Sequence, residues 1–468
     1  MIEVINRNAF YQDEKEEWLT IKFSTDEDEP IEGGEGEGEG ESEEGEVGPT
    51  ITLTSDDIVG DSFEMFDGIT NHECLNFQNS ISTYIKFTTT HTEYALMGRW
   101  LEVRKYIWDA VNEDTIEVDL GKYYCATDNM SRDGLTQEIV AYDKMFHVLN
   151  TDPEVITALY HEIYQNVSPV NVKNFRDYFF RELGVEQDNT ALINDDIVLP
   201  KQLSDDDLID GGTIVKMIAE INGVFPHIKN DGLLHWISLD VGDIFESTTF
   251  PSSTLYPSDK TFPCKGYEGF YVDIYKDQYV KDSLVWANYS ALPPDGVQIR
   301  NELNQIAYFA NSENSINPYT VINNFLCFGL QYGQYQQIAE RLYQKIKDIS
   351  YIPYEIVKMS DPCIEVGDRL LIRTQNDHMF SSYLFTRHTA GIRGAFEESK
   401  ALGQLLLSQY DLGGATNNTD RKLKNLDNRV GNIEKSGSGP LQIQSVAELP
   451  ASPQLNVLYL IQGEVVVS

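Results

Sequence analysis

The residues whose types could bind a metal or a phosphate do not have the spacing that this chemistry requires. His161 and Glu162 begin the motif of a zinc peptidase helix, but Gln165 stands where the second histidine ligand would be. The Gly and Glu residues that alternate at 34–41 lack a lysine, and their carboxylates would repel a phosphate group. We therefore predict no catalytic residue, no metal ligand and no cofactor-binding residue from local motifs.

Two further patterns lead to the same expectation. The stretch from Asn129 to Gly134 resembles a calcium-binding loop, but it does not begin with a carboxylate and its twelfth position is Val140. The cysteines are far apart and never in CxxC spacing, which is typical of buried thiols and not of a disulfide framework or a zinc site. They are Cys74, Cys125, Cys264, Cys327 and Cys363.

The charge balance of the chain excludes whole classes of function. Its 468 residues contain 35 Lys and Arg against 75 Asp and Glu, a formal net charge of −40. A surface this acidic should neither wrap DNA nor adhere to anionic lipid, because both depend on basic side chains. No stretch approaches the roughly 18 apolar residues of a membrane span, and the first residues do not resemble a signal peptide. We expect a protein that is made and folded in a cytoplasm.

The elements that would position a site follow from the hydropathy periods. Residues 50–141 have a period of two, which predicts half-buried antiparallel strands of a sandwich or barrel. Residues 142–243 have a period of 3.6 and predict three helices, the first opening at Asp152 with Val155, Leu159 and Ile163 on one face. Residues 244–403 return to short strands, interrupted by one helix around Leu342.

The last part of the chain has a different pattern. Four apolar residues are spaced three, four and three apart between polar neighbours, which predicts a short coiled-coil seam: Leu423, Leu426, Val430 and Ile433. The breaker SGSGP follows. The end of the chain then reads as strand with apolar residues on both faces, and we expect it to dock a distal protein through Val457, Tyr459, Ile461, Val465 and Val467.

Three segments of the sequence resemble one family, in the order and with the spacing of that family. They are ITLTSDDIVGDSFEMFDGITNHECLNFQNSISTYIKFTTT at 51–90, TIEVDLGKYYCATDNMSRDGLTQEIVAYDKMFHVLN at 115–150 and CIEVGDRLLIRTQNDHMFSSYLFTRHTAGIRGAFEESKALG at 363–403. Together they resemble the tail-tip hub proteins of phages and prophages of Gram-positive bacteria, often called tail-associated lysin-like proteins. The resemblance spans roughly residues 50–403.

The resemblance implies an α+β, mainly β fold in which two β-barrel hub domains are split by an α/β insert. It also implies a homotrimer that forms a ring below the tail tube. The resemblance and the residue patterns together predict five parts. They are a first barrel at 1–141, which contains a disordered acidic loop at 26–49, an α/β insert at 142–243, a second barrel with an inserted helix at 244–403, a helix and trimeric coiled-coil linker at 404–440, and a small C-terminal β segment at 441–468. The acidic loop, the coiled coil and the C-terminal segment follow from the residue patterns and not from the resemblance.

The same resemblance implies a structural role in the virion tail, after assembly in the host cytoplasm. The trimer would cap the tail tube beside the distal tail protein. It would form the channel for the tape measure protein and for DNA, which passes without specific binding, and anchor a fibre or receptor-binding protein below. An acidic wall suits such a channel, because DNA should not adhere to it. No cofactor is expected.

Two alternatives of another class remain open at this point. One is a hydrolase of peptidoglycan, cell-wall or capsule polysaccharide, whose paired carboxylates would be hidden among the many acidic residues. The sequence disfavours it, because no compact catalytic domain remains once the hub segments are assigned. The other is a carbohydrate-binding module that uses surface tyrosines, of which the chain has 26 in all.

Overall fold

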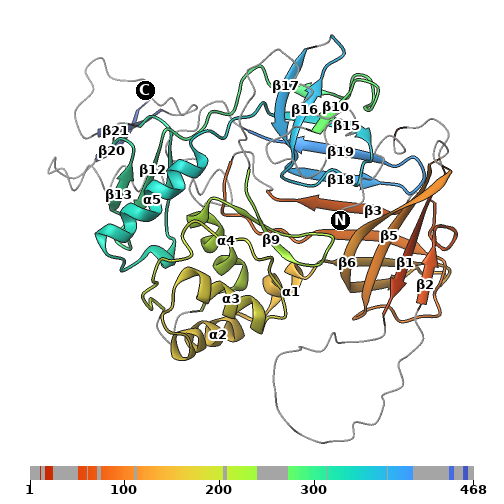
Figure 1. Cartoon of the computed structure of the whole chain (residues 1–468), viewed down its shortest axis with the longest axis horizontal. Coiled ribbons are helices and arrows are strands. Elements are labelled where there is room, and N and C mark those ends of the chain that lie inside the picture. Colours follow the sequence, from red (N-terminus) through yellow and green to blue (C-terminus); the bar gives the residue numbers. More distant parts are fainter. Residues whose placement is uncertain are drawn as a thin grey trace, which may run out of the picture. The chain divides into compact units, whose positions relative to one another are not determined.

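Strands make up most of the regular structure in the computed structural model of the chain (Figure 1). The chain divides into two units, Met1–Leu406 and Leu407–Ser468. The residues that the structure describes are 11, 16–24, 51–60, 62–70, 75–109, 113–203, 208–239, 272–313, 315–376, 378–403, 442–446 and 457–461. The acidic loop predicted at 26–49 and the predicted coiled-coil residues Leu423, Leu426, Val430 and Ile433 lie outside these ranges, as do Val465 and Val467.

The first unit is built on one sheet of eleven strands. Seven come from the first part of the chain: β1 (Glu16–Phe23), β2 (Ile51–Thr54), β3 (Glu64–Gly68), β4 (Tyr84–Thr89), β5 (Trp100–Asp109), β6 (Asp114–Met130) and β7 (Gln137–Tyr142). Four come from the last part of the unit: β11 (Val285–Trp286), β15 (Tyr354–Met359), β18 (Thr386–Ala390) and β19 (Phe396–Ala401). All neighbours in this sheet are antiparallel.

The pair β3–β18 joins these two groups of strands, with Phe66 opposite His388. Figure 1 shows β18, drawn in blue, beside β3, drawn in red-orange. The sheet runs from β11 at one end to β2 at the other, so these eleven strands form one open sheet and not two closed barrels. The strands and their order along the chain agree with the sequence prediction. Barrel closure does not, because which strands become neighbours depends on residues far apart in the sequence.

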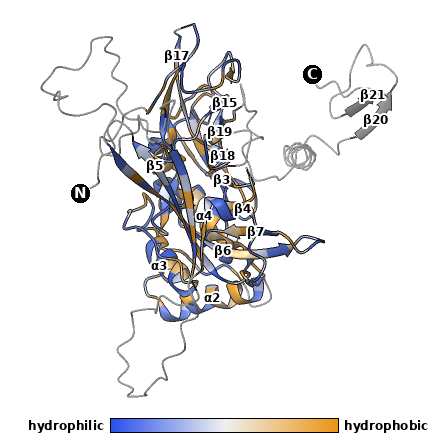
Figure 2. Ribbon diagram, turned by 90° about the vertical axis from the view of Figure 1, so that its right-hand side faces the viewer, coloured by the Kyte–Doolittle hydropathy of each residue, from blue (hydrophilic) through white to orange (hydrophobic). Residues whose placement is uncertain are grey.

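The buried face of the sheet follows the period-two pattern. Ile85 and Phe87 are fully buried, whereas Tyr84 and Lys86 between them are only half-buried. The same alternation holds along β5, and Figure 2 shows hydrophobic and hydrophilic residues interspersed along the strands. Each strand therefore contributes every second residue to the core, as a pleated strand must.

The α/β insert begins directly after β7. It contains α1 (Met145–Asn150), α2 (Pro153–Asn166), α3 (Val172–Glu182), α4 (Gly211–Asn222), β8 (Phe225–Ile228) and β9 (Leu234–Ile237). Side chains that accept hydrogen bonds cap the starts of the three longer helices: Asp152, Asn171 and Asp210. One predicted position is wrong: Val155 is 54% exposed, because the buried face of α2 is centred on Ile156, Leu159 and Ile163.

Two smaller sheets complete the first unit. One contains β10 (Val272–Ile274), β16 (Arg369–Arg373) and β17 (Met379–Tyr383). The other contains β12 (Gly296–Arg300), β13 (Ile306–Ala310) and β14 (Pro318–Val321), with α5 (Tyr332–Ile346) packed against it. Helix α5 confirms the helix predicted around Leu342, and Ile338, Leu342 and Ile346 are fully buried. Short 3-10 helices lie at η2 (Ser55–Asp57) and η3 (Phe325–Cys327).

The second unit contains β20 (Gln442–Val446) and β21 (Val457–Ile461), which pair in parallel.

The helices within the described ranges are all too short or too polar to cross a membrane.

Candidate functional site

A cluster of buried polar side chains lies where three separate parts of the chain meet. We call it the junction cluster, and it consists of Asp67, Thr83, Asp143, His227 and Arg387. Asp67 on β3 accepts hydrogen bonds at Oδ2 from Nε of Arg387, 2.9 Å away on β18, and at Oδ1 from the hydroxyl of Thr83 at 3.2 Å. Nε2 of His227 on β8 lies 3.4 Å from Oδ1 of Asp67. The cluster thus connects the first strands, the insert and the last strands of the unit.

Strand periodicity and register place the central ion pair. Asp67 has the same parity as the buried Met65 on β3, so its carboxylate points into the core. Arg387 stands directly opposite Asp67 in the β3–β18 pair, and their side chains are each 4% exposed. Arg387 also donates a hydrogen bond from Nη1 to the carbonyl of Ile364 at 2.6 Å. Burying either charge alone would cost much free energy, and the pairing of the two charges offsets this cost.

Asp143 and His227 have pKa values that burial shifts in the direction of their neutral forms. Burial raises the pKa of Asp143 to about 7, although Ser82, Thr83 and Met145 all donate hydrogen bonds to its carboxylate, at 2.6, 2.8 and 3.0 Å. Burial likewise lowers the pKa of His227. Its Nδ1 has no hydrogen-bond partner among the described residues.

The space beside the junction cluster is small. A cavity of about 10 Å³ is lined by several of its residues and by the segment from Ile228 to Asn230. That volume corresponds to about one water molecule. The arrangement connects the insert, through His227, with strand β3 of the large sheet.

Glu220 forms a second connection of the same kind. It is fully buried on α4 and accepts hydrogen bonds from the side-chain amides of Gln78, at 2.8 Å, and Asn324, at 2.9 Å. Burial raises the pKa of Glu220 to about 7. The three residues come from the segment before β4, the insert and the segment before η3. Distant parts of the chain again meet at a buried carboxyl group.

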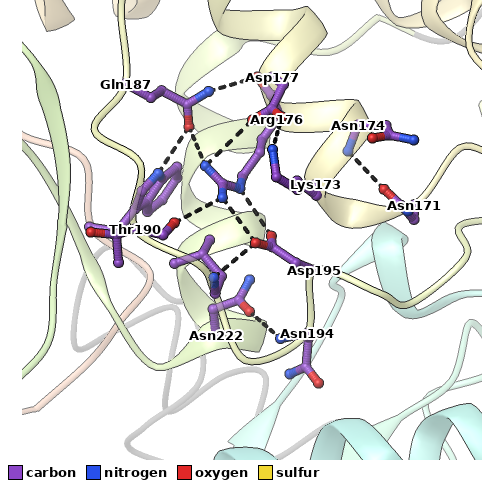
Figure 3. A network of polar contacts seen from close by, with 12 residues as sticks. Asn171, Lys173, Asn174, Arg176, Asp177, Gln187, Thr190, Asn194, Asp195 and Asn222 are labelled. Carbon is purple, nitrogen blue, oxygen red and sulfur yellow. Dashed lines mark hydrogen bonds and ion pairs between the residues drawn. The ribbon is translucent and has the colours of Figure 1, made fainter.

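A third network lies within the insert (Figure 3). Arg176 of α3 is 2% exposed and forms a bidentate ion pair with Asp195, with Nε–Oδ1 and Nη2–Oδ2 distances of 3.0 and 2.9 Å. It also donates to Oε1 of Gln187 at 2.8 Å and to the carbonyl of Thr190 at 3.0 Å. The network connects α3 with the loop that follows it, from Gln187 to Asp195.

Two more ion pairs are buried in the large sheet. Lys105 and Glu17 lie 2.8 Å apart, and Lys358 and Glu397 lie 2.9 Å apart with both side chains fully buried. Each pair joins neighbouring strands, β5 with β1 and β15 with β19. Within the ranges that the structure describes, no three His, Cys, Asp or Glu side chains gather as a metal ion would require.

The sequence analysis did not identify these buried networks, and the residues that it did single out lie elsewhere. Val457, Tyr459 and Ile461 lie in β21, whose backbone pairs with β20. Cys125 and Cys327 are buried, and Cys363 is half-buried. The signal for the junction cluster was a charged residue at a core-facing position of an apolar strand. Asp67 is such a residue, but its partner Arg387 is 320 residues away, so no local pattern connects the two.

Comparison with known proteins gives tail proteins as structural neighbours. No family model and no curated protein sequence matches the chain. The 43 kDa tail protein of prophage MuSo2 from Shewanella oneidensis has a TM-score of 0.41 at 9% identity, over 82% of this chain and 97% of that one. Prophage tail protein gp18 from Listeria monocytogenes has a TM-score of 0.40 at 10% identity, over 87% and 99%. The tail protein from Neisseria meningitidis has a TM-score of 0.40 at 10% identity, over 73% and 91%.

Proposed function

We propose that this chain is a structural hub protein at the tail tip of a phage or a phage-tail-like particle, and not an enzyme. Three copies form a ring that caps the tail tube next to the distal tail protein. The ring surrounds a channel for the tape measure protein and for DNA. It also anchors a fibre or receptor-binding protein on its far side.

The observation that carries this proposal is the way the large sheet is built. Strands from 16–142 and from 285–401 form a single sheet, while the α/β insert between them is attached through polar contacts of the buried residues His227 and Glu220. The resemblance of residues 50–403 implies two β-barrel domains split by an α/β insert; the chain has this order of β, α/β and β parts, although the eleven strands of the large sheet do not close into barrels. A ring component must keep these parts in fixed relative positions, and the Asp67–Arg387 pair supports that by tying the two β segments together.

The composition supports the channel and the distal attachment. With a net charge of −40, the chain presents a surface to which DNA should not adhere during passage. The heptad seam at 423–433 would bring three copies of the chain together at one point and raise the local concentration of the three C-terminal segments. Short helices are marginal in water, so the larger unit must supply most of the trimer interface.

Oligomeric state tests the proposal most directly. The purified full-length chain, 53.1 kDa, should have three times that mass by mass photometry and by light scattering after gel filtration. Negative-stain images of the same sample should show rings with a central opening. A stable monomer at micromolar concentration in physiological salt would overturn the proposal.

A further inference from the structure

Five aromatic residues occupy directly opposite positions on five adjacent strands of the large sheet. Phe66 on β3 faces Tyr84 on β4, Tyr84 faces Tyr142 on β7, Tyr142 faces Tyr124 on β6, and Tyr124 faces Trp100 on β5. We call this set the aromatic row. It crosses the strands at right angles, and neighbouring strands lie roughly 4.8 Å apart, so the row is about 19 Å long.

The aromatic row lies on the face of the sheet that points away from the core. Its members are all half-buried. The residues beside them along the strands, among them Met65, Ile85, Ala141 and Leu101, are buried in the core. Since successive residues of a strand point to opposite faces, the row must point outward.

The described part of the chain covers this row only in part. Helix α1 places Phe146 4.6 Å from Tyr142 and His147 4.6 Å from Tyr124, measured between ring centroids. His147 also lies 5.6 Å from Trp100. The rings of the row remain partly accessible despite these contacts, which leaves a continuous aromatic strip without a complete cover.

The orientation of the rings favours a protein partner over a sugar. Phe66 and Tyr84 are stacked, with centroids 5.5 Å apart and an angle of 18° between the ring planes, and Tyr142 and Phe146 are stacked at 15°. Tyr124 and Trp100 meet edge to face. A sugar ring stacks on a free aromatic face, whereas several of these faces are already occupied by neighbouring rings. Packed aromatic edges and hydroxyl groups are typical of protein interfaces.

The charges around the aromatic row are compatible with a second copy of this chain as the partner. Two copies of a chain with a net charge of −40 repel each other, so they must meet where charges are few or paired. None of the five row residues carries a charge, and burial, together with the nearby Glu64 carboxylate, raises the pKa of Tyr84 further above its ordinary value. The charges on the neighbouring positions of the same face are paired: Lys86 and Glu138 lie 2.9 Å apart.

From these observations we infer that a second copy of this chain covers the aromatic row. The inference rests on the proposed function, because it names one contact surface of the trimeric ring. It adds the location of that contact surface, which is the outer face of β3, β4, β7, β6 and β5 at the aromatic row.

A charge introduced into the row tests the inference. In the full-length chain, Tyr84→Glu and Tyr142→Glu should each weaken self-association at least tenfold, measured by mass photometry over a dilution series. The matched control is Tyr106→Glu. Tyr106 is a half-buried aromatic residue on the same face of β5 but outside the row, where it stacks on Trp18 at 5.5 Å. The control should associate like the unmodified chain.

The possible outcomes separate the two proposals. If the unmodified chain is a monomer, both the hub proposal and this inference fail. If it is a trimer and both row variants associate like the Tyr106→Glu control, only the inference fails. A measurement on the unmodified chain guards against misfolded variants: on assembly, hydroxyl-radical labelling of Tyr84, Tyr142 and Trp100 should fall severalfold, whereas labelling of Tyr94, which is 37% exposed, should not. Equal labelling of the row before and after assembly would also overturn the inference.

Discussion

Arg387→Met tests whether the junction cluster holds the two β segments together. The substitution removes both contacts of the guanidinium with Asp67, at 2.9 and 2.8 Å, and the hydrogen bond to the carbonyl of Ile364. Asp67 would keep the hydroxyl of Thr83 but lose its cationic partner, in a place where only 3% of the residue is exposed. Breaking one side of such a buried pair costs about 3–5 kcal/mol, because a buried charge is left uncompensated.

Replacing both partners separates the charge effect from packing. In Asp67→Leu/Arg387→Met no uncompensated charge remains. The losses are the hydrogen bond of the Ile364 carbonyl, worth about 1–3 kcal/mol, and the hydrogen bond of the Thr83 hydroxyl. The double variant should therefore be less destabilised than Arg387→Met alone, a strong coupling between the two sites. Urea unfolding of the full-length chain, followed by tryptophan fluorescence, measures each midpoint.

The matched control is Arg393→Met. Arg393 pairs with Asp56 at 3.3 Å, but the two side chains are 71% and 88% exposed. Solvent screens an exposed pair, so this variant should unfold at nearly the same urea concentration as the unmodified chain. If Arg387→Met shifts the midpoint no more than Arg393→Met does, the junction cluster does not have the role assigned to it.

Three further predictions follow from the same structure. The pKa of Glu220 in the folded chain is about 7, above that of an unfolded glutamate, so its contribution to stability is present at low pH and is lost as the pH rises toward and through 7. Glu220→Gln should therefore reduce the fall in urea midpoint between pH 5 and pH 8, and an unchanged pH dependence would contradict the shift. Deleting residues 26–46 should leave the unfolding midpoint nearly unchanged, because Phe23 at the end of β1 and Ile51 at the start of β2 already stand opposite each other, and loop length enters stability only logarithmically. Loss of soluble trimer after the deletion would disprove this. The double change Leu426→Asp/Val430→Asp should leave the ring intact but remove distal proteins from purified particles, and particles with their full set of distal proteins would refute the docking role.

Much of the local structure was predictable from the sequence alone. The alternation around Ile85 places Thr83, Ile85 and Phe87 on the buried face, as the structure has them. Asp152 and Pro153 open a helix, and Gly223, at a φ of 60°, ends another. These features depend on residues within a few positions of one another. Side chains return to the same face every two residues in a strand and about every 3.6 residues in a helix, and a helix cap forms within one turn.

Only the tertiary structure decided which strands become neighbours and where charge is buried. The pairing of β3 with β18, the ion pair of Asp67 with Arg387 and the continuous row from Phe66 to Trp100 all join residues that no local pattern connects. Asp67 stands at a core-facing position of β3, and a charge there is tolerated only because a residue from a distant part of the chain pairs with it. Whether Asp67 and Arg387 pair depends on the free energy of the whole sheet, including the entropy of closing a loop of about 320 residues. It does not depend on the few residues around either of them.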